Sequence, residues 1–417
     1  MLALGVVLLS VAIAGSPASA RVQAVSGRAG ASGSLAGTNR VTYSNYATCA
    51  KARAGQASCL AIRRNVFVNG VRQHSLTPAT GTSFGATALR KAYGIRALGT
   101  RRKVVAIVDA MHSGSAFADL TEYRSMYSLG AMDNCGADGE ALSALPAGKN
   151  PCFVQLDQSG LVNQSPATTD TGWAQEIALD LDMASAACPH CSIVLVEANT
   201  SSFADLASAV GVAANFQDVV AISNSYGGPD VTESRVPQYG SAAASGIAVV
   251  ASSGDSGYGV SAPASFSSVI GVGGTSLFTD STGAWSSEQA WSSGGSGCSI
   301  LNPAPAWQDP QVTGCVGKAV VDVAAVADPA TGVSVCFDGQ WYSFGGTSAA
   351  APFIAGLFTV KKNFGSSAGA FLWQNQASLH DISIGSNGRC RPLNMCNAGA
   401  GFDGNTGWGS PNGAGAF

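Results

Sequence analysis

Apolar runs of strand length alternate along this chain with helix-forming stretches, and this alternation limits the fold to a few layered α/β architectures. Short apolar runs separated by helical segments are typical of strands that are buried on both faces of a parallel sheet. The expected strands are Val104–Asp109, Ser192–Val196, Val219–Ser223, Ala248–Ala251 and Val269–Val272. The expected helices are Ala116–Ser128, Gln175–Ala186 and Ser202–Asn215. The sequence therefore predicts a doubly wound, mainly parallel sheet flanked by helices.

One serine lies in a setting that exposes its hydroxyl, in the stretch Gly346-Thr347-Ser348-Ala349-Ala350-Ala351-Pro352. Gly345 and Gly346 permit a tight turn and the close approach of another backbone, and the alanines favour a helix that begins near Ser348. Pro352 is compatible with that helix if it lies near the first turn. The positive end of the helix dipole favours negative charge near Ser348. Because serine is also a preferred helix cap, the stretch alone fits a nucleophile and a cap about equally.

A nucleophilic serine needs a base. The chain has four histidines, none in a convincing catalytic setting: His74, His112, His190 and His380. The expected helix Gln175–Ala186 instead carries Glu176 and Asp180 four positions apart, and therefore on one face. Two close carboxylates tend to share a proton, which makes an acid/base pair suited to low pH. Asp182 points elsewhere, and on the spacing alone two solvated acids are the more common arrangement.

Asp255 is a third candidate for a catalytic role. The apolar run Ile247–Ser252 predicts a buried strand that leads into Ser253-Gly254-Asp255-Ser256-Gly257. An acid in a glycine-flanked turn at a strand end lies where open α/β sheets usually bind ligands. A protonated Asp255 can donate a hydrogen bond to an oxyanion. A plain turn aspartate fits the same residues.

In this order, Glu176-x-x-Leu179-Asp180, Ser253–Gly257 and Gly346-Thr347-Ser348 with Pro352 resemble motifs of the sedolisin family of serine-carboxyl peptidases. The resemblance covers roughly residues 80–417. It implies a subtilisin-like α/β fold and an endopeptidase that cuts protein or peptide substrates at acid pH. It also implies four roles, namely Ser348 as nucleophile, Glu176 as general base, Asp180 as its orienting partner and Asp255 as oxyanion donor.

The segment Ser223-Asn224-Ser225-Tyr226-Gly227-Gly228 follows an expected strand and resembles the substrate-binding segment of that family. A peptide can add there as an extra strand along Ser225, Tyr226 and Gly227, with the Tyr226 ring lining a side-chain pocket. A simple turn at the strand end is about equally compatible with the sequence.

The resemblance further implies one structural Ca²⁺ near the C-terminus, held by two carboxylates and by backbone carbonyls. By position, these ligands are Asp381, Asp403 and the carbonyls of Ile382, Gly399 and Gly401. Calcium takes six to eight oxygen ligands, and glycines let carbonyls turn inward. Without the resemblance, the same residues are more typical of a glycine-rich loop that binds no metal.

Two other functions are compatible with parts of the chain. The first is a subtilisin-type Asp-His-Ser protease, because Lys103–Asp109 looks like the strand that carries its aspartate. His112 is too close in sequence to Asp109 to serve as the separate base of a triad, so we interpret Asp109 as a structural acid. The second is an inactive, calcium-stabilised binding protein of the same fold, although all four proposed catalytic side chains are present.

The N-terminal region predicts secretion. Leu2–Ala14 is an apolar run of signal-peptide length, and Ala18-Ser19-Ala20 has the form of a cleavage site, although a basic n-region is missing. We expect a signal peptide at 1–20, a short prosegment or extension at 21–79 and the catalytic domain at 80–417. No other stretch reaches the roughly 20 apolar residues that a membrane span needs.

The cysteines agree with an oxidising compartment. The 11 cysteines form five sequence-neighbour pairs and one remainder, although connectivity does not follow from sequence alone. The expected pairs are Cys49/Cys59, Cys135/Cys152, Cys188/Cys191, Cys298/Cys315 and Cys390/Cys396, with Cys336 left over. With 11% charged residues, a net charge of −3 and no basic run, the chain has no sign of a nucleic-acid-binding surface. We expect a secreted monomer.

Overall fold

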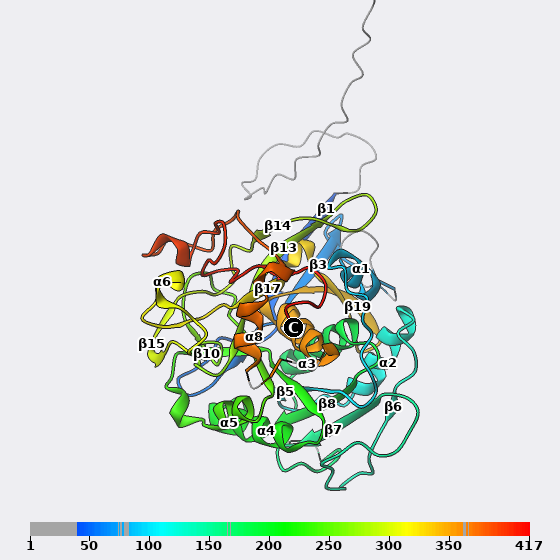
Figure 1. The fold of residues 1–417 in the computed structure, drawn as a ribbon. Coiled ribbons are helices and arrows are strands. Elements are labelled where there is room, and N and C mark those ends of the chain that lie inside the picture. The colour runs from blue at the N-terminus through cyan, green and yellow to red at the C-terminus, as the bar shows by residue number, and fades with distance from the viewer. Residues whose placement is uncertain are drawn as a thin grey trace, which may run out of the picture. The chain divides into compact units, whose positions relative to one another are not determined.

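A nine-stranded sheet forms the centre of the fold, in the order β14-β13-β11-β9-β5-β8-β7-β6 with β17 paired to β13 (Figure 1). Its strands are β5 (Val104–Ala110), β6 (Asp133–Asn134), β7 (Cys152–Asp157), β8 (Ser192–Ala198), β9 (Val219–Asn224), β11 (Ala248–Ser252), β13 (Ile270–Thr279), β14 (Trp285–Ala290) and β17 (Val323–Val326). Every neighbour pair is parallel except β13 with β14. All five strands expected from the sequence belong to this sheet.

The fold is seen in a computed structural model that describes residues 40–73, 75, 77–78, 83–164, 166, 168–361, 364–365 and 367–417. The expected signal peptide at 1–20, the boundary between residues 79 and 80, and His74 lie outside the described residues.

Helices cover both faces of the sheet, as alternate residues of β5 show. The helices are α1 (Ala86–Ala92), α2 (Ala116–Met126), α3 (Thr171–Ala187), α4 (Phe203–Asn215), α5 (Gln238–Ala244), α6 (Pro310–Thr313), α7 (Thr347–Lys361) and α8 (Ala368–Gln374). Val105 and Ile107 belong to the core that includes α3 and α7, whereas Val104 and Ala106 belong to the core that includes α4 and α5. Because successive side chains of a strand point to opposite faces, each face has its own helical layer. The predicted subtilisin-like α/β fold is confirmed.

Helices α3 and α7 pack closely, and this contact brings two sequence-distant motifs together. Asp170 caps α3, because its side chain accepts hydrogen bonds from the amides of Gly172 and Trp173. A Cβ on Gly356 of α7 would lie 2.6 Å from the Cβ of Ala187. Only glycine therefore permits this approach of the two helices.

The proline of α7 lies deeper in the helix than the sequence suggested. Helix α7 begins at Thr347, so Pro352 is its sixth residue and lies past the first turn. Proline has no N–H, so the backbone carbonyl of Ser348 lacks its usual helical partner at this position.

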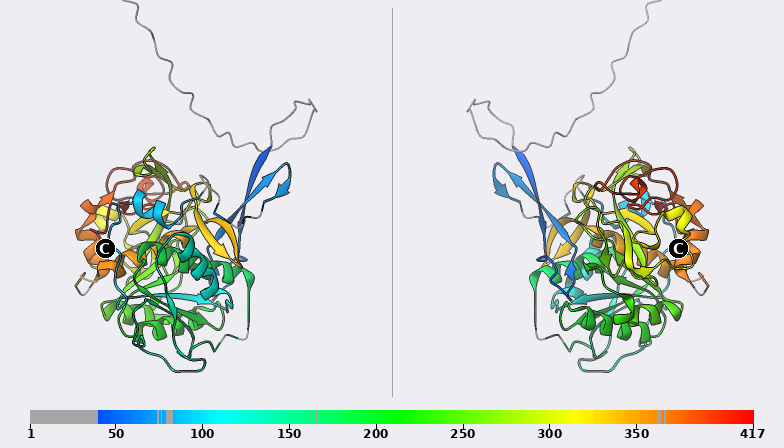
Figure 2. Two further views of the ribbon diagram at one scale, coloured as in Figure 1. Left: turned by 90° about the vertical axis from the view of Figure 1, so that its right-hand side faces the viewer. Right: turned by 90° about the vertical axis from the view of Figure 1, so that its left-hand side faces the viewer.

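Residues 41–72 supply strands to two smaller sheets of the same compact unit, which spans Arg40–Phe417. One sheet has the order β1-β3-β19-β18 with β4 paired to β3, and the other has the order β12-β10-β2. Their strands are β1 (Val41–Ala47), β2 (Ser58–Cys59), β3 (Ile62–Val68), β4 (Val71–Arg72), β10 (Tyr226–Pro229), β12 (Ser261–Ala262), β18 (Val333–Phe337) and β19 (Gln340–Gly345). Figure 2 shows the blue strands β1 and β3 extending from the body of the unit.

Two short antiparallel pairs complete the strand arrangement, β15 (Cys298–Pro303) with β16 (Gly317–Ala319) and β20 (Leu379–His380) with β21 (Ser410–Pro411). All five expected disulfides are present, and Cys336 is a buried free cysteine. None of the helices in the described ranges combines the length and the apolar character of a membrane span.

Candidate active site

Ser348 is the second residue of α7, directly after a sharp backbone turn. Gly346 has a φ of 97°, in the region that favours glycine, and so provides the turn into the helix. The Ser348 side chain is buried, and its hydroxyl donates to the backbone carbonyl of Ser225, 3.2 Å away. The serine thus lies at the positive end of α7 and against the start of β10.

Glu176 and Asp180 lie on α3, and both are fully buried. Glu176 Oε2 accepts hydrogen bonds from the amides of Leu60, at 2.8 Å, and Ala61, at 2.6 Å. Burial raises the pKa of Glu176 to about 8, against the lowering effects of the nearby Ser348 hydroxyl and of the hydrogen bonds from the two amides. Burial also raises the pKa of Asp180 well above its usual range, and the charges of Asp109 and Glu176 add to the rise.

Asp109 belongs to this group of carboxylates, which the sequence interpretation as a structural acid did not predict. It lies near the end of β5 and is fully buried, and neither carboxylate oxygen has a hydrogen-bond partner within the described residues. Burial raises the pKa of Asp109 well above its usual range, with further contributions from Glu176 and Glu197. Asp182 points elsewhere, as expected, and accepts from the amide of Cys336 at 3.0 Å.

Asp255 lies beside the nucleophile's helix. Its Oδ1 accepts hydrogen bonds from the amide and the hydroxyl of Thr347, each at 2.8 Å. Its Oδ2 is buried and has no hydrogen-bond partner among the described residues. Burial raises the pKa of Asp255 to about 7, so the carboxyl group is protonated in acid solution, and Oδ2 is then the free donor of the pair.

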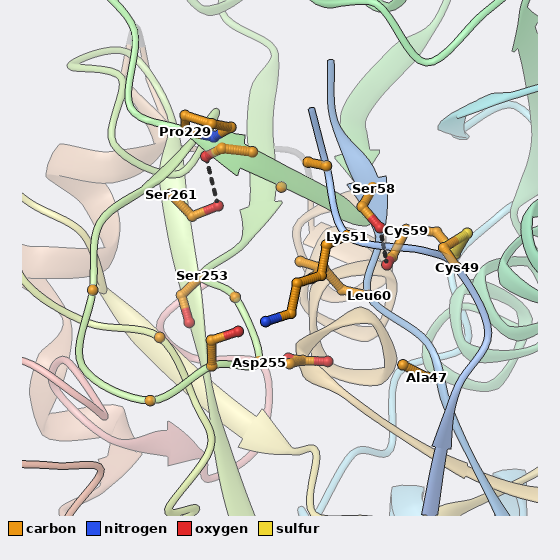
Figure 3. A pocket seen from close by; sticks show the side chains of 18 of the residues that line it. Ala47, Cys49, Lys51, Ser58, Cys59, Leu60, Pro229, Ser253, Asp255 and Ser261 are labelled. Atoms are coloured by element: carbon orange, nitrogen blue, oxygen red, sulfur yellow. Dashed lines mark hydrogen bonds between the residues drawn. A yellow bond between two sulfur atoms is a disulfide. The ribbon is translucent and has the colours of Figure 1, made fainter. Parts of the chain in front are cut away.

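A cavity of about 510 Å³ lies beside these groups. Its lining includes Gly227 and Asp255, together with Leu60 and Lys51 from the N-terminal part of the chain. Figure 3 shows Lys51 pointing toward Asp255. The Tyr226 side chain is instead fully buried. Its hydroxyl bonds to Asn224 and Tyr239. The ring of Tyr226 is not among the residues that line this cavity and lies beside the ring of Trp173 instead.

The expected calcium ligands come together around one loop. Asp403 is buried and accepts from the amide of Gly399 at 3.2 Å, while Asp381 accepts from the amide of Gly401 at 3.0 Å. Burial raises the pKa of Asp403 to about 7. Within the described part of the chain, no group of three or more His, Cys, Asp or Glu residues is arranged for a metal ion. The predicted set contains only two carboxylates and otherwise uses carbonyl oxygens, including that of Ile382, so it is compatible with this finding.

Two histidines have partners away from Ser348. His112 Nδ1 lies 2.8 Å from Glu197 Oε2, and the His380 ring stacks on Trp285 with centroids 3.9 Å apart. The hydrogen bond to Glu197 raises the pKa of His112. Among the described residues, the ionisable groups on the α3 side of Ser348 are therefore carboxylates.

The model of the subtilase family matches residues 168–409 of this chain. Kumamolisin from Bacillus sp. (strain MN-32) is 34% identical over 299 residues, which cover 63% of this chain and 53% of kumamolisin. Sedolisin from Pseudomonas sp. (strain 101) is 34% identical over 205 residues, which cover 41% of this chain and 34% of sedolisin. The alignments thus span about half, or less, of the length of these relatives.

Among solved structures, the complex of Pseudomonas sedolisin (serine-carboxyl proteinase) with two molecules of pseudo-iodotyrostatin is similar to this fold. The TM-score is 0.65 at 24% sequence identity, over 80% of this chain and 96% of that chain. This similarity supports the fold assignment made from the sheet topology.

Proposed function

Because this chain belongs to the subtilase family and, within that fold, to the sedolisin family, we propose that it is a serine-type endopeptidase. It hydrolyses protein or peptide substrates at acid pH through an acyl-enzyme on Ser348. The observation that carries the proposal is the grouping of one serine, a buried pair of carboxylates and a third, partly buried acid, contributed by α7, α3 and the turn after β11. The names kumamolisin and sedolisin among the relatives agree with peptidase chemistry.

In the proposed acylation step, Ser348 Oγ attacks the scissile carbonyl carbon while Glu176 takes the hydroxyl proton. The nearby Ser348 hydroxyl lowers the pKa of Glu176 against the effect of burial, and this closeness supports the pairing. Glu176 then gives the proton to the leaving amine as the C–N bond breaks. In deacylation, Glu176 takes a proton from water, and the resulting ester hydrolysis restores the Ser348 hydroxyl.

The carboxylates crowded behind Ser348 share protons, because like charges so close together cannot all ionise. A proton on Asp180 lets it donate to Glu176 and orient it, which favours the ionised form of Glu176 that a base needs against the burial that raises its pKa to about 8. Asp109, on β5, belongs to the same group of carboxyl groups, because its charge raises the pKa of Asp180 and the charge of Glu176 raises its own pKa. This role for Asp180 explains why a second acid lies one helical turn from Glu176 in a fully buried position.

Protonated Asp255 stabilises the oxyanion by donating from Oδ2. Because burial raises its pKa to about 7, this donor is present in acid solution and is lost as the pH rises through that value. Acid conditions are therefore required for oxyanion stabilisation at this site.

We propose one structural calcium ion at the C-terminal loop. Asp381, Asp403 and the carbonyls of Ile382, Gly399 and Gly401 would hold it, and the ion would supply fixed positive charge between the two carboxylates. The contacts that both carboxylates already make with residues 399 and 401 support the fit. The ion has no part in the chemical steps above.

We also propose that the protein is secreted by means of a signal peptide at 1–20, which is then removed, and that the mature enzyme is a monomer. Five disulfides support an oxidising compartment. Peptide substrates would add as a strand along Ser225, Tyr226 and Gly227, of which the latter two already pair with another strand through their backbone.

The pH dependence of cleavage of a denatured protein, with Ser348→Ala prepared in parallel, tests this function. Cleavage that peaks in acid and is absent in the variant supports the serine-carboxyl mechanism. A serine-dependent optimum at or above neutral pH favours the subtilisin-type alternative. No cleavage at any pH, in folded and calcium-loaded protein, favours an inactive binding protein of the same fold.

A further inference from the structure

A segment of the chain itself occupies the position where a peptide substrate is expected to bind. Strand β2 pairs antiparallel with β10, with Cys59 opposite Tyr226 and Ser58 opposite Gly227. Continuing this register by one residue places Leu60 opposite Ser225. The segment is therefore bound as an added strand, in the manner of a peptide in a cleft.

The peptide bond between Leu60 and Ala61 faces the three proposed catalytic elements. The Ala61 amide donates to Glu176 Oε2 at 2.6 Å, which is the atom that must protonate a leaving amine. The nucleophile lies at the same end of β10, because its hydroxyl donates to the carbonyl of Ser225, the residue directly before this strand.

The Leu60 carbonyl oxygen lies beside the proposed oxyanion donor. The position that a Cβ on Gly346 would take is 1.9 Å from the oxygen of Leu60 and 2.7 Å from Oδ2 of Asp255. Both oxygens thus crowd the same point, next to the turn that leads into α7. The Asp255 oxygen at this point is the one that lacks a hydrogen-bond partner among the described residues.

The Leu60 side chain lies in the cavity beside β10. A Cβ on Gly227 would be 3.3 Å from Leu60 Cδ1, so the side chain passes directly over that glycine. Leu60 also lines the cavity of about 510 Å³ that Asp255 borders. The space beside β10 therefore accepts a branched apolar side chain on the amino side of the peptide bond.

We propose that Leu60–Ala61 is a self-processing site, cut within the same molecule by Ser348. The inference rests on the proposed peptidase function and names its first substrate. Ser348 Oγ bonds to the Leu60 carbonyl carbon, the bond to the Ala61 nitrogen breaks, and the serine proton passes through Glu176 to that nitrogen. Water then hydrolyses the Leu60 ester, which leaves a carboxylate on Leu60 and restores the serine hydroxyl.

The disulfides and strands around the bond allow the two products to exist separately. The Cys49–Cys59 disulfide lies wholly on the amino-terminal side of the cut, and no other disulfide includes a cysteine before Ala61. On the carboxyl-terminal side, Ile62 pairs with Gly345, so β3 stays attached to β19. The mature chain then begins at Ala61 rather than near residue 80.

The test uses the full-length protein, purified and incubated at a series of pH values from acid to neutral. Intact mass measurement and N-terminal sequencing are expected to find a new N-terminus at Ala61 and a fragment that ends at Leu60. The fragments separate on a denaturing gel without reduction. The rate constant is expected to be independent of protein concentration, and Ser348→Ala stays uncut.

Variants of Leu60 test the side-chain contact. Leu60→Asp is expected to slow self-cleavage at least about tenfold, because a carboxylate must enter a largely apolar cavity, while Leu60→Met keeps an apolar side chain there and is expected to be cut faster than Leu60→Asp. If Leu60→Asp fails to fold, a synthetic peptide of residues 56–66 with Ser in place of Cys59 replaces it. The processed enzyme is expected to cut this peptide after Leu60.

The same samples are assayed on a denatured protein, which separates the two proposals. Cleavage of that protein while the Leu60–Ala61 bond stays intact, or self-cleavage at another bond, overturns the self-processing site alone. A cut at Leu60–Ala61 whose rate rises with protein concentration overturns the intramolecular step. Failure to cut either the chain or the added protein overturns the proposed function and the processing site together.

Discussion

Replacing Asp255 by Asn tests whether this buried carboxyl group is protonated in the folded protein. Burial raises its pKa from the ordinary 3.8 to about 7. At about 1.36 kcal/mol per pKa unit, ionising Asp255 lowers the free energy of unfolding by roughly 4 kcal/mol. A group whose pKa is raised on folding stabilises the native state fully below its unfolded pKa. That contribution is lost as the pH rises from about 4 to about 7.

Asparagine cannot ionise, and its Oδ1 can accept the two hydrogen bonds from Thr347 that Asp255 accepts. Asp255→Asn is therefore expected to match the parent in stability near pH 4 and to exceed it near pH 8 by up to about 4 kcal/mol. For residues 40–417, an unfolding entropy of roughly 0.8 kcal/mol per kelvin converts this difference to about 5 °C in Tm.

The assay is thermal unfolding at both pH values, with Ser348→Ala in every protein to prevent self-digestion. Asp133→Asn serves as the matched control, because Asp133 is exposed and its exchange is expected to leave Tm unchanged at both pH values. The raised pKa of Asp403 affects both proteins alike and cancels in the comparison, whereas the charge of Asp255 is one cause of the raised pKa of Glu176, so the measured difference includes this coupling. A difference between Asp255→Asn and its parent that is equal at both pH values would refute the reasoning.

Three further predictions concern the proposed site. Asp255→Ala is expected to lower kcat on the order of a hundredfold or more through loss of the oxyanion donor, and full retained activity in steady-state kinetics contradicts that role. Removing calcium with a chelator is expected to lower Tm, since ligand at a hundred times its Kd stabilises by about 2.7 kcal/mol; Asp403→Asn should abolish this calcium dependence, and a Tm unaffected by calcium in the parent contradicts the metal site. His112→Gln is expected to keep most of the acid protease activity, because His112 bonds to Glu197; loss of activity with an unchanged fold would point to an imidazole base.

The sequence predicted those features that are encoded within one segment. The spacing of Glu176 and Asp180 puts them on one helix face wherever the helix packs, and the run after Ser348 predicts the start of α7. The sequence could not predict that Asp109 joins these carboxylates, because this contact depends on how β5 meets α3. Nor could it predict that the Tyr226 side chain is fully buried with its hydroxyl on Tyr239, since that contact depends on how β10 packs against α5.

The N-terminal segment was beyond prediction for a related reason. Leu60 contacts Glu176 across 116 positions of sequence, and nothing in residues 58–61 identifies β10 as the partner strand. Backbone hydrogen bonds dominate this pairing, and they leave little signal in side-chain identity. Only the cysteine spacing indicated the local loop, through the confirmed disulfide between Cys49 and Cys59.

The segment of Leu60 and Ala61, which covers the Glu176 carboxylate, also links self-cleavage to the pH dependence of catalysis. Burial is the largest cause of the raised pKa of Glu176, and Leu60 and Ala61 lie directly on its carboxylate. Departure of Leu60 after the cut admits water, and the pKa of Glu176 should then fall, since lost burial outweighs the lost amide bond. A base must be ionised to act, so its rate falls as the pH drops below its pKa. Self-cleavage should therefore lose rate at a higher pH than cleavage of an added substrate by the processed enzyme. The two pH profiles can be measured in one preparation. If both rates fall over the same pH range on the acid side, the segment does not alter the pKa of Glu176.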